Sequence, residues 1–319
     1  MSKKISESLN KHRSIALAVV ATLIVLSVVS TPRLMAKGTV FVDADASGTM
    51  DGSEEHPFNN IQDAINRASE KDRNVFIEDG TYKENLELWS DIEMVGEERG
   101  EVVIKAKNDN DPVILMYDDT EIHNLVLKDG KNGVRIKRGA KATVANCDII
   151  DNDKDGIKAR ESKTKNSQKL EVYDSYIAEN GGNGIYTERK KVYLGDNLIE
   201  KNDKDGIELA TGSEGKIKDS RIKKNDGVGI KLFVQDSEIE VDGVTIRDNE
   251  RDGIEVRSNG IEGFIHIEDC KFNDNERWAI ARLVTTPYPR TNWDTAVMIT
   301  NPTFIETQIG KTSPQIRVF

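Results

Sequence analysis

The stretch Asn152-Asp-Lys-Asp-Gly156-Ile157 returns fifty residues later as Asn202-Asp-Lys-Asp-Gly206-Ile207. Both place an Asn four residues before a Gly that is followed by Ile. Further copies of the pattern begin at Asn180, Asn225, Asn249 and, in degenerate form, Asn275. Successive copies lie 22 to 28 residues apart. A period in the low twenties that recurs this often predicts a solenoid, in which each repeat stacks on the next.

Each repeat is expected to contain one sharp bend. The position six residues before the Asn favours residues that tolerate a left-handed backbone. It holds Asn146, Asp174, Asp196, Asp219, Gly243 and Asp269, with His123 at the equivalent place upstream. We interpret this column as one left-handed bend per repeat.

Apolar and polar residues alternate on both sides of this bend and again after the repeated Gly. Each repeat therefore contains three short strands, rich in β-branched residues, with turns between them. One apolar column after the Gly holds Val134, Ile157, Ile185, Ile207, Ile230, Ile254 and Ile280. Three-sided coils of this size form three parallel sheets around a packed interior. The sequence thus predicts an all-β fold, a parallel β-helix of about nine to ten coils.

The repeated Asn residues are predicted to be structural. Their side-chain amides can hydrogen-bond from coil to coil in a ladder, and the alternative is that each Asn only forms a turn. Cys147 and Cys270 both follow the bend, five rungs apart. At about 4.8 Å per rung, that separation is far beyond the reach of a disulfide. We expect two small interior side chains, not a redox pair or a metal site.

The N-terminus has the features of an export signal. Residues 1–37 start with basic side chains, and their apolar run, 15–29, is shorter than the roughly 20 residues that span a bilayer. The segment is either a cleaved signal peptide or an uncleaved membrane anchor, and any membrane contact is expected through 15–29 alone. In both cases the rest of the chain is exported, as a secreted, periplasmic or cell-surface protein.

The rest of the chain divides into three parts. They are an N-terminal cap with the first coils (38–105), the repeats (106–283), and a last coil with a C-terminal cap (284–319). In the N-terminal cap, residues 60–69 have the pattern of an amphipathic helix, with Asn59 or Asn60 as its N-cap. A solenoid must cover the open end of its core, so we expect this short helix to be the lid.

Two stretches before the repeats carry a resemblance to a known family. They are Pro57-Phe58-Asn-Asn-Ile61-Gln62-Asp-Ala64-Ile65 and Val75-Phe-Ile-Glu-Asp-Gly80-Thr-Tyr82. Together with the Gly-Ile repeats they resemble the right-handed parallel β-helix proteins of the pectin-lyase-like superfamily, over residues 38–310. The resemblance implies a right-handed β-helix. It does not assign an activity, because the superfamily includes polysaccharide lyases, hydrolases, epimerases, phage tailspikes and adhesins.

The outward positions of the strand after the Gly are the candidate location of an active site. In lyases of this fold, the resemblance implies clustered Asp ligands for Ca²⁺ and a nearby Arg or Lys base. These positions hold no Asp cluster, and their charges alternate in sign, which is typical of a solvated face. The alternative is a carbohydrate-binding face, because aromatic rings stack on sugars and charged groups bind hydroxyls. Its candidate substrate-binding residues are Arg160, Tyr186, Glu208, Lys231, Phe233 and Glu255, and no catalytic residue is assigned.

No cofactor is expected. Ca²⁺ is the alternative, because it is the one ion for which the sequence offers ligands. The loop that holds Asp43, Asp45, Asp51, Glu54 and Glu55 is rich in carboxylates, which Ca²⁺ prefers. It lacks the EF-hand pattern, so we interpret it as an exposed acidic turn. The four His residues are scattered, and no zinc or copper site is indicated.

The charge of the chain restricts its partners. The net charge is −11, and removing residues 1–37 leaves 39 basic and 55 acidic residues, a net of −16. Such a surface disfavours nucleic acid and polyanionic sugars. We expect an exported, non-enzymatic protein that binds polysaccharide or another cell-surface component. The alternative is a carbohydrate-active enzyme, a polysaccharide lyase or glycoside hydrolase, that acts on the Gly-Ile face.

Overall fold

The structure is a computed structural model, and it describes residues 38–71, 74–160, 169–258, 263–284, 296–305 and 310–312. The predicted signal or anchor at 1–37 lies outside the described residues, as do parts of the predicted C-terminal cap. No helix within these ranges combines the length and the apolar character needed to cross a membrane.

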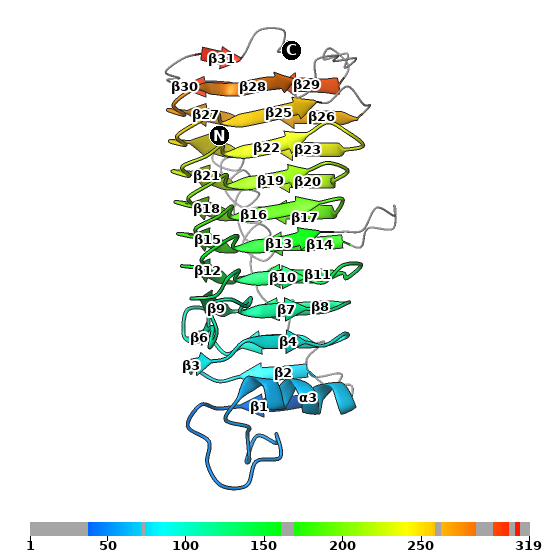
Figure 1. The fold of residues 1–319 in the computed structure, drawn as a ribbon, viewed down its shortest axis with the longest axis vertical. Helices are drawn as coiled ribbons and strands as arrows, with labels where there is room; N and C mark the ends of the chain where they lie inside the picture. Colours follow the sequence, from blue (N-terminus) through cyan, green and yellow to red (C-terminus); the bar gives the residue numbers. More distant parts are fainter. Residues whose placement is uncertain are drawn as a thin grey trace, which may run out of the picture.

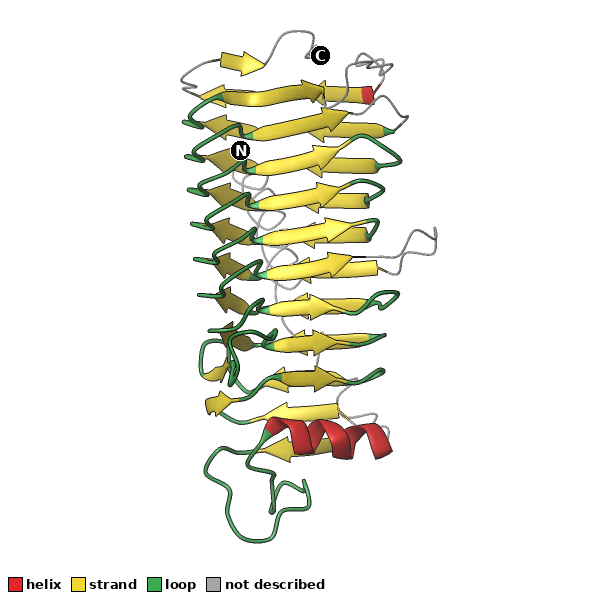
Figure 2. Ribbon diagram, in the orientation of Figure 1, coloured by secondary structure: helices red, strands yellow, loops and turns green. Residues whose placement is uncertain are grey.

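Three sheets run the length of the molecule (Figures 1 and 2), and within each sheet neighbouring strands pair in parallel. Sheet A, in spatial order, consists of β1 (Thr39–Val42), β2 (Asn74–Ile77), β5 (Glu93–Gly96), β8 (Thr120–His123), β11 (Ala142–Ala145), β14 (Lys169–Tyr173), β17 (Lys191–Gly195), β20 (Glu214–Lys218), β23 (Glu238–Asp242), β26 (Phe264–Glu268) and β29 (Val297–Thr300).

Sheet B consists of β3 (Gly80–Lys83), β6 (Val102–Lys105), β9 (Leu125–Lys128), β12 (Asp148–Ile150), β15 (Tyr176–Ala178), β18 (Leu198–Glu200), β21 (Arg221–Lys223), β24 (Thr245–Arg247), β27 (Lys271–Asn273) and β30 (Thr303–Ile305). Sheet C consists of β4 (Leu86–Leu88), β7 (Ile114–Met116), β10 (Val134–Ile136), β13 (Ile157–Arg160), β16 (Ile185–Glu188), β19 (Ile207–Ala210), β22 (Ile230–Phe233), β25 (Ile254–Ser258), β28 (Trp278–Val284) and β31 (Gly310–Thr312).

From β2 onward, each coil contributes one strand to sheet A, then to sheet B, then to sheet C, as Figure 1 shows by the regular step of the labels. The apolar column predicted after the repeated Gly lies in sheet C and is fully buried from Ile157 to Ile280. Equivalent columns from sheets A and B complete one continuous hydrophobic core. The parallel β-helix predicted from the sequence is therefore confirmed.

The Asn ladder is confirmed as well. Each side-chain Nδ2 donates to Oδ1 of the next Asn along the stack, at 3.0, 3.0, 2.9, 3.0 and 2.8 Å from Asn152 to Asn275. The residue before each of these Asn has a positive φ, a second column of left-handed bends that the sequence analysis did not predict. It includes Glu179, Lys201 and Lys224, which have no special preference for this conformation.

The predicted bend column is correct from Asn146 onward, where φ is 52°, through Asp269, where it is 50°. The placement of His123 in this column is wrong. The left-handed residue of that coil is Asn124, with φ of 62°, and His123 is the last residue of β8, opposite Ala145. A shift of one residue moves a strand side chain to the other face. His123 therefore lies on the outward face of sheet A.

Helix α3 (Ile61–Lys71) covers the N-terminal end of the core (Figure 2), as predicted. Asn60 is its N-cap, because Asn60 Oδ1 accepts a hydrogen bond from the backbone N–H of Asp63 at 2.8 Å. The carboxylate of Glu84 adds a second cap, accepting from the N–H groups of Ile61 and Gln62 at 2.7 and 3.0 Å. Elsewhere in the chain, Cys147 and Cys270 are both free and buried, as predicted for two small interior side chains.

Candidate functional site

The six residues predicted to bind substrate lie on sheet C. Tyr186, Glu208, Lys231 and Glu255 follow one another on successive rungs in a single column. Arg160 on β13 and Phe233 on β22 lie two residues further along their strands. The side chains of five of the six are half-buried or exposed, whereas Glu255 is buried.

The charged members of this set are bound to one another or to close neighbours. Lys231 Nζ lies 2.8 Å from Asp205 Oδ2 and 3.2 Å from Glu208 Oε2. Glu255 accepts a hydrogen bond from Arg257 Nε at 2.6 Å. These pairs satisfy the charges along the face, as the solvated-face interpretation expects. Substrate binding by the six residues stays a prediction.

A groove lies on a different face, the outward surface of sheet A. Side chains of five successive strands, β14, β17, β20, β23 and β26, line a volume of about 450 Å³. Tyr193 and Phe264 are its aromatic residues, and His266 lies beside Phe264 with 6.3 Å between the ring centroids. Phe264 is 37% exposed, so one of its faces is open to a ligand.

Two glycines lie close to the groove, Gly215 in its lining and Gly195 beside Tyr193. Gly215 occupies an inward column between Val192 and Ile239 and has φ of +136°, a conformation that only glycine adopts readily. A Cβ there would lie 1.9 Å from the carbonyl oxygen of Val192. At Gly195 a Cβ would lie 3.2 Å from Cε1 of Tyr193. The absence of a side chain at Gly195 therefore leaves room for the Tyr193 ring.

Positive and negative charges are paired across the groove. Lys216 Nζ lies 2.6 Å from Glu240 Oε2, and Lys191 Nζ lies 3.6 Å from Glu214 Oε2. His266 Nε2 is 3.2 Å from the hydroxyl oxygen of Thr300 on the next rung. The groove therefore combines two aromatic rings with hydrogen-bonding groups of both signs, and these suit a polar ligand without a large net charge.

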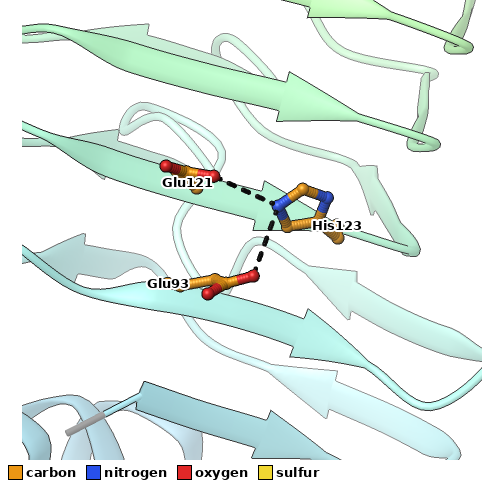
Figure 3. A group of neighbouring side chains, drawn as sticks. All are labelled: Glu93, Glu121 and His123. Atoms are coloured by element: carbon orange, nitrogen blue, oxygen red, sulfur yellow. Dashed lines mark ion pairs between the residues drawn. The ribbon is translucent and has the colours of Figure 1, made fainter. Parts of the chain in front are cut away.

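A second feature of the same sheet is a group formed by Glu93, Glu121 and His123, here called the Glu–Glu–His cluster (Figure 3). Glu93 and Glu121 are opposite each other on β5 and β8. Their carboxylates approach one ring nitrogen, His123 Nε2, at 3.7 and 3.6 Å. This nitrogen is buried and has no hydrogen-bond partner. Two carboxylates and an imidazole are a donor set that can hold a metal ion.

Tyr173 lies in the same column as His123, two rungs away, with the small side chain of Ala145 between them. Burial raises the pKa of the Tyr173 hydroxyl, and the negative charges of Glu121 and other nearby acids raise it further. The phenol therefore stays protonated at neutral pH beside the cluster.

The acidic loop after β1 uses its carboxylates within the loop itself. Asp43 Oδ1 accepts from the N–H of Asp45 at 2.8 Å, and Asp51 Oδ1 accepts from the N–H of Ser53 at 2.9 Å. Hydrogen bonds from Ser53 hold the pKa of Asp51 below its usual value. Over the described ranges, three loop carboxylates do not converge on one point. Ca²⁺ binding in this loop stays a prediction.

Comparison with known proteins identifies the fold. A family described as right handed beta helix region matches residues 132–286. No curated protein matches the sequence. Among solved structures, the A-module of the mannuronan C-5 epimerase AlgE6 from Azotobacter vinelandii is similar with a TM-score of 0.56 and 14% identity, over 80% of this chain and 93% of that one.

Two other solved structures have the same fold. Pectate lyase Pel9A aligns with a TM-score of 0.53 and 10% identity, over 87% of this chain and 78% of the lyase. The tailspike gp49 of the Acinetobacter baumannii bacteriophage Fri1, a capsular polysaccharide depolymerase, aligns with a TM-score of 0.56 and 11% identity, over 88% and 56% of the two chains. At these identities the likeness extends to the fold alone. The three parallel sheets and the continuous Asn ladder give the chain the parallel β-helix fold, which it shares with these structures, and its residues 132–286 match the right-handed β-helix family.

Proposed function

We propose that this protein is exported and binds a polysaccharide along the groove of sheet A, without cleaving it. The observation that carries the proposal is the groove itself, which extends over five rungs and contains two aromatic rings between paired charges. In-register strands repeat their side chains at regular intervals, so a chain-like ligand can contact several rungs at once.

The dimensions of the groove suit an oligosaccharide. Tyr193 on β17 and Phe264 on β26 are three rungs apart, a separation of about 14 Å along the stack at ~4.8 Å per rung. Aromatic rings bind the apolar faces of sugars, and Lys, Glu and His side chains between the rings bind hydroxyl groups. A segment of a few sugar units would contact both rings and the polar side chains between them.

Charge favours a neutral or weakly charged glycan. The lysines of the groove are matched by glutamates, with Lys216–Glu240 at 2.6 Å as the tightest pair. The net charge of the whole chain is −11. A polyanion would meet repulsion from this surface, whereas the hydroxyls of a neutral sugar can bind both partners of each ion pair.

The structural neighbours support a carbohydrate ligand, because an epimerase acting on mannuronan, a pectate lyase and a capsular polysaccharide depolymerase are among them. They do not favour binding over catalysis. The preference for binding comes from the groove, in which two of the glutamates face lysines, with Glu240 at 2.6 Å from Lys216 and Glu214 at 3.6 Å from Lys191. A general acid or base needs a carboxylate that is free to exchange a proton.

The test is a panel of neutral and acidic polysaccharides, incubated with the purified full-length protein. Binding is measured by affinity electrophoresis, and turnover is measured as new reducing ends or unsaturated products, with and without Ca²⁺. We expect retarded migration in at least one neutral polysaccharide and no product. Product release would replace the proposal by a lyase or hydrolase function. A panel without any ligand would contradict the carbohydrate proposal itself.

A further inference from the structure

We propose that the Glu–Glu–His cluster binds a divalent transition-metal ion of the Zn²⁺ type on the outward face of sheet A. The ligands would be one carboxylate oxygen each from Glu93 and Glu121, and Nε2 of His123. The site is distinct from the groove, because its strands β5 and β8 do not contribute to the groove lining.

The distances between the three donor atoms match a shared ion. His123 Nε2 lies 3.7 Å from Glu93 Oε1 and 3.6 Å from Glu121 Oε2, and all three atoms lie within 4.8 Å of one another. Two ligands that are each about 2.1 Å from a Zn²⁺ ion are roughly 3.4–3.6 Å apart at angles between tetrahedral and trigonal. The two distances from His123 Nε2 to the carboxylates are therefore already close to those between ligands of one ion.

A simple ion pair would have a different geometry. A protonated His next to a carboxylate forms a charge-assisted hydrogen bond of about 2.7–2.9 Å. Here the buried Nε2 approaches two carboxylates and forms a hydrogen bond to neither. Leaving a buried ring nitrogen without a partner is costly unless another group binds it. An ion between the three side chains satisfies the nitrogen and balances the two carboxylates.

The surroundings hold the ligands in place. Asn74, on the rung before Glu93, accepts a hydrogen bond from the Glu93 N–H at 3.2 Å and donates from Nδ2 to Glu93 Oε2 at 3.3 Å. This contact orients the carboxylate so that Oε1 is directed at His123. Outer-sphere hydrogen bonds of this kind fix the ligand geometry of metal sites. The ligands come from two paired strands of a sheet, which are rigid supports.

The donor set selects the class of ion. Ca²⁺ takes six to eight oxygen ligands, whereas imidazole nitrogen with carboxylate oxygen suits Zn²⁺ and its neighbours. The exposed fractions rise from 4% at Glu93 to 12% at His123 and 20% at Glu121, so one side of the cluster faces solvent. Three protein ligands leave at least one coordination position for water or a ligand group.

The experiment is a Zn²⁺ titration of the tag-free, full-length protein after treatment with a chelator, by calorimetry and by competition with a chromogenic chelator. We expect one ion per chain. His123→Ala should weaken binding at least 100-fold, and Asn74→Ala should weaken it by roughly 10- to 100-fold through the orientation of Glu93. Co²⁺ absorption provides a second readout, since bands of a low-coordinate Co²⁺ site should be present in the wild type and absent from His123→Ala.

His266→Ala is the matched control, because His266 is another outward His of sheet A, with Glu268 at 4.0 Å and a hydroxyl partner. It should bind Zn²⁺ as the wild type does. Far-UV circular dichroism verifies that each variant is folded. If a variant does not fold, Glu121→Gln, which lies at the exposed edge of the cluster, is used in its place. The proposal is overturned if no stoichiometric binding occurs, if His123→Ala and Glu121→Gln retain it, or if Ca²⁺ competes equally with Zn²⁺.

Discussion

Asn202, in the middle of the ladder, is the position at which the stability of the coil stack is tested best. Its side chain is fully buried. Its Oδ1 accepts hydrogen bonds from Asn180, from the backbone N–H at 3.2 Å and from Nδ2 at 3.0 Å. Its Nδ2 donates to Asn225 Oδ1 at 2.9 Å. This Nδ2 also donates to the carbonyl oxygens of Glu200 at 3.2 Å and Ile177 at 3.4 Å. Replacing Asn202 with Ala removes all five bonds at once, of which three join the Asn residues of the ladder.

The expected loss can be worked out from the partners. Three hydrogen bonds at about 1 kcal/mol each give roughly 3 kcal/mol. Two of the three partner atoms still have another hydrogen bond in the variant. Asn180 Nδ2 still donates to the carbonyl oxygen of Ile149 at 3.1 Å, and Asn225 Oδ1 still accepts from the backbone N–H of residue 202 at 3.1 Å. The N–H of Asn180 is left buried without its acceptor, which adds about 1 kcal/mol or more. We predict a total loss of about 3–5 kcal/mol.

Urea unfolding followed by far-UV circular dichroism measures this loss. Asn273→Ala is the control, because Asn273 is half-buried and its Nδ2 bonds to the adjacent Asp274 at 2.8 Å. That variant should change the free energy of unfolding by less than about 1 kcal/mol. Hydrogen exchange should increase locally in the coils next to residue 202, since each coil is stabilised by its neighbours. An Asn202→Ala protein as stable as the control would refute the ladder as a source of stability.

Three further predictions concern single positions. Gly215→Ala should lower the free energy of unfolding by about 2 kcal/mol or more, because φ is +136° and a Cβ would lie 1.9 Å from the Val192 carbonyl; urea unfolding measures it. Burial raises the pKa of the Cys147 and Cys270 thiols to about 12, so a thiol reagent at pH 8 should label them only after denaturation. Burial also raises the pKa of Asp252, so the native state gains a proton at higher pH than the unfolded chain. The free energy of unfolding of the wild type, relative to that of Asp252→Asn, should therefore rise as the pH falls from 7 towards about 4. Urea unfolding of both proteins across this pH range checks the sign.

Much of the fold could be predicted because a solenoid repeats the same constraint in every coil. One Asn column and one apolar column define the register of sheet C, and six copies make a chance pattern improbable. The prediction failed at His123, where the Asn is missing. Gly130 takes the place of the Asn, with its N–H bonded to Asn152 Oδ1 at 3.1 Å, and Gly133 follows it after three residues instead of four. Counting back from Gly133 therefore placed the bend one residue early.

The groove of sheet A was missed for a different reason. Its outward positions lie five residues and three residues before each bend, and the second of these columns holds Tyr193, Lys216, Glu240 and His266. The sequence contains this column, but the predicted site rested on the outward positions of the strand after the repeated Gly. The φ of Gly215 and the ring position of Tyr193 are not predictable from the sequence pattern. The Glu–Glu–His cluster joins residues from two coils. Predicting it would have required the correct register of β8, which places His123 on the same outward face as Glu93 and Glu121.

The central claim, that a polysaccharide binds along sheet A, is tested most directly by comparing two double variants. Tyr193→Ala with Phe264→Ala removes both rings of the groove, and Tyr186→Ala with Phe233→Ala removes both rings of the sheet C face. The measurement is the Kd of each variant for the polysaccharide that the panel identifies. We predict at least a tenfold loss, about 1.4 kcal/mol, for the sheet A variant and no change for the sheet C variant. The reverse result would contradict the account and place binding on the Gly-Ile face of sheet C.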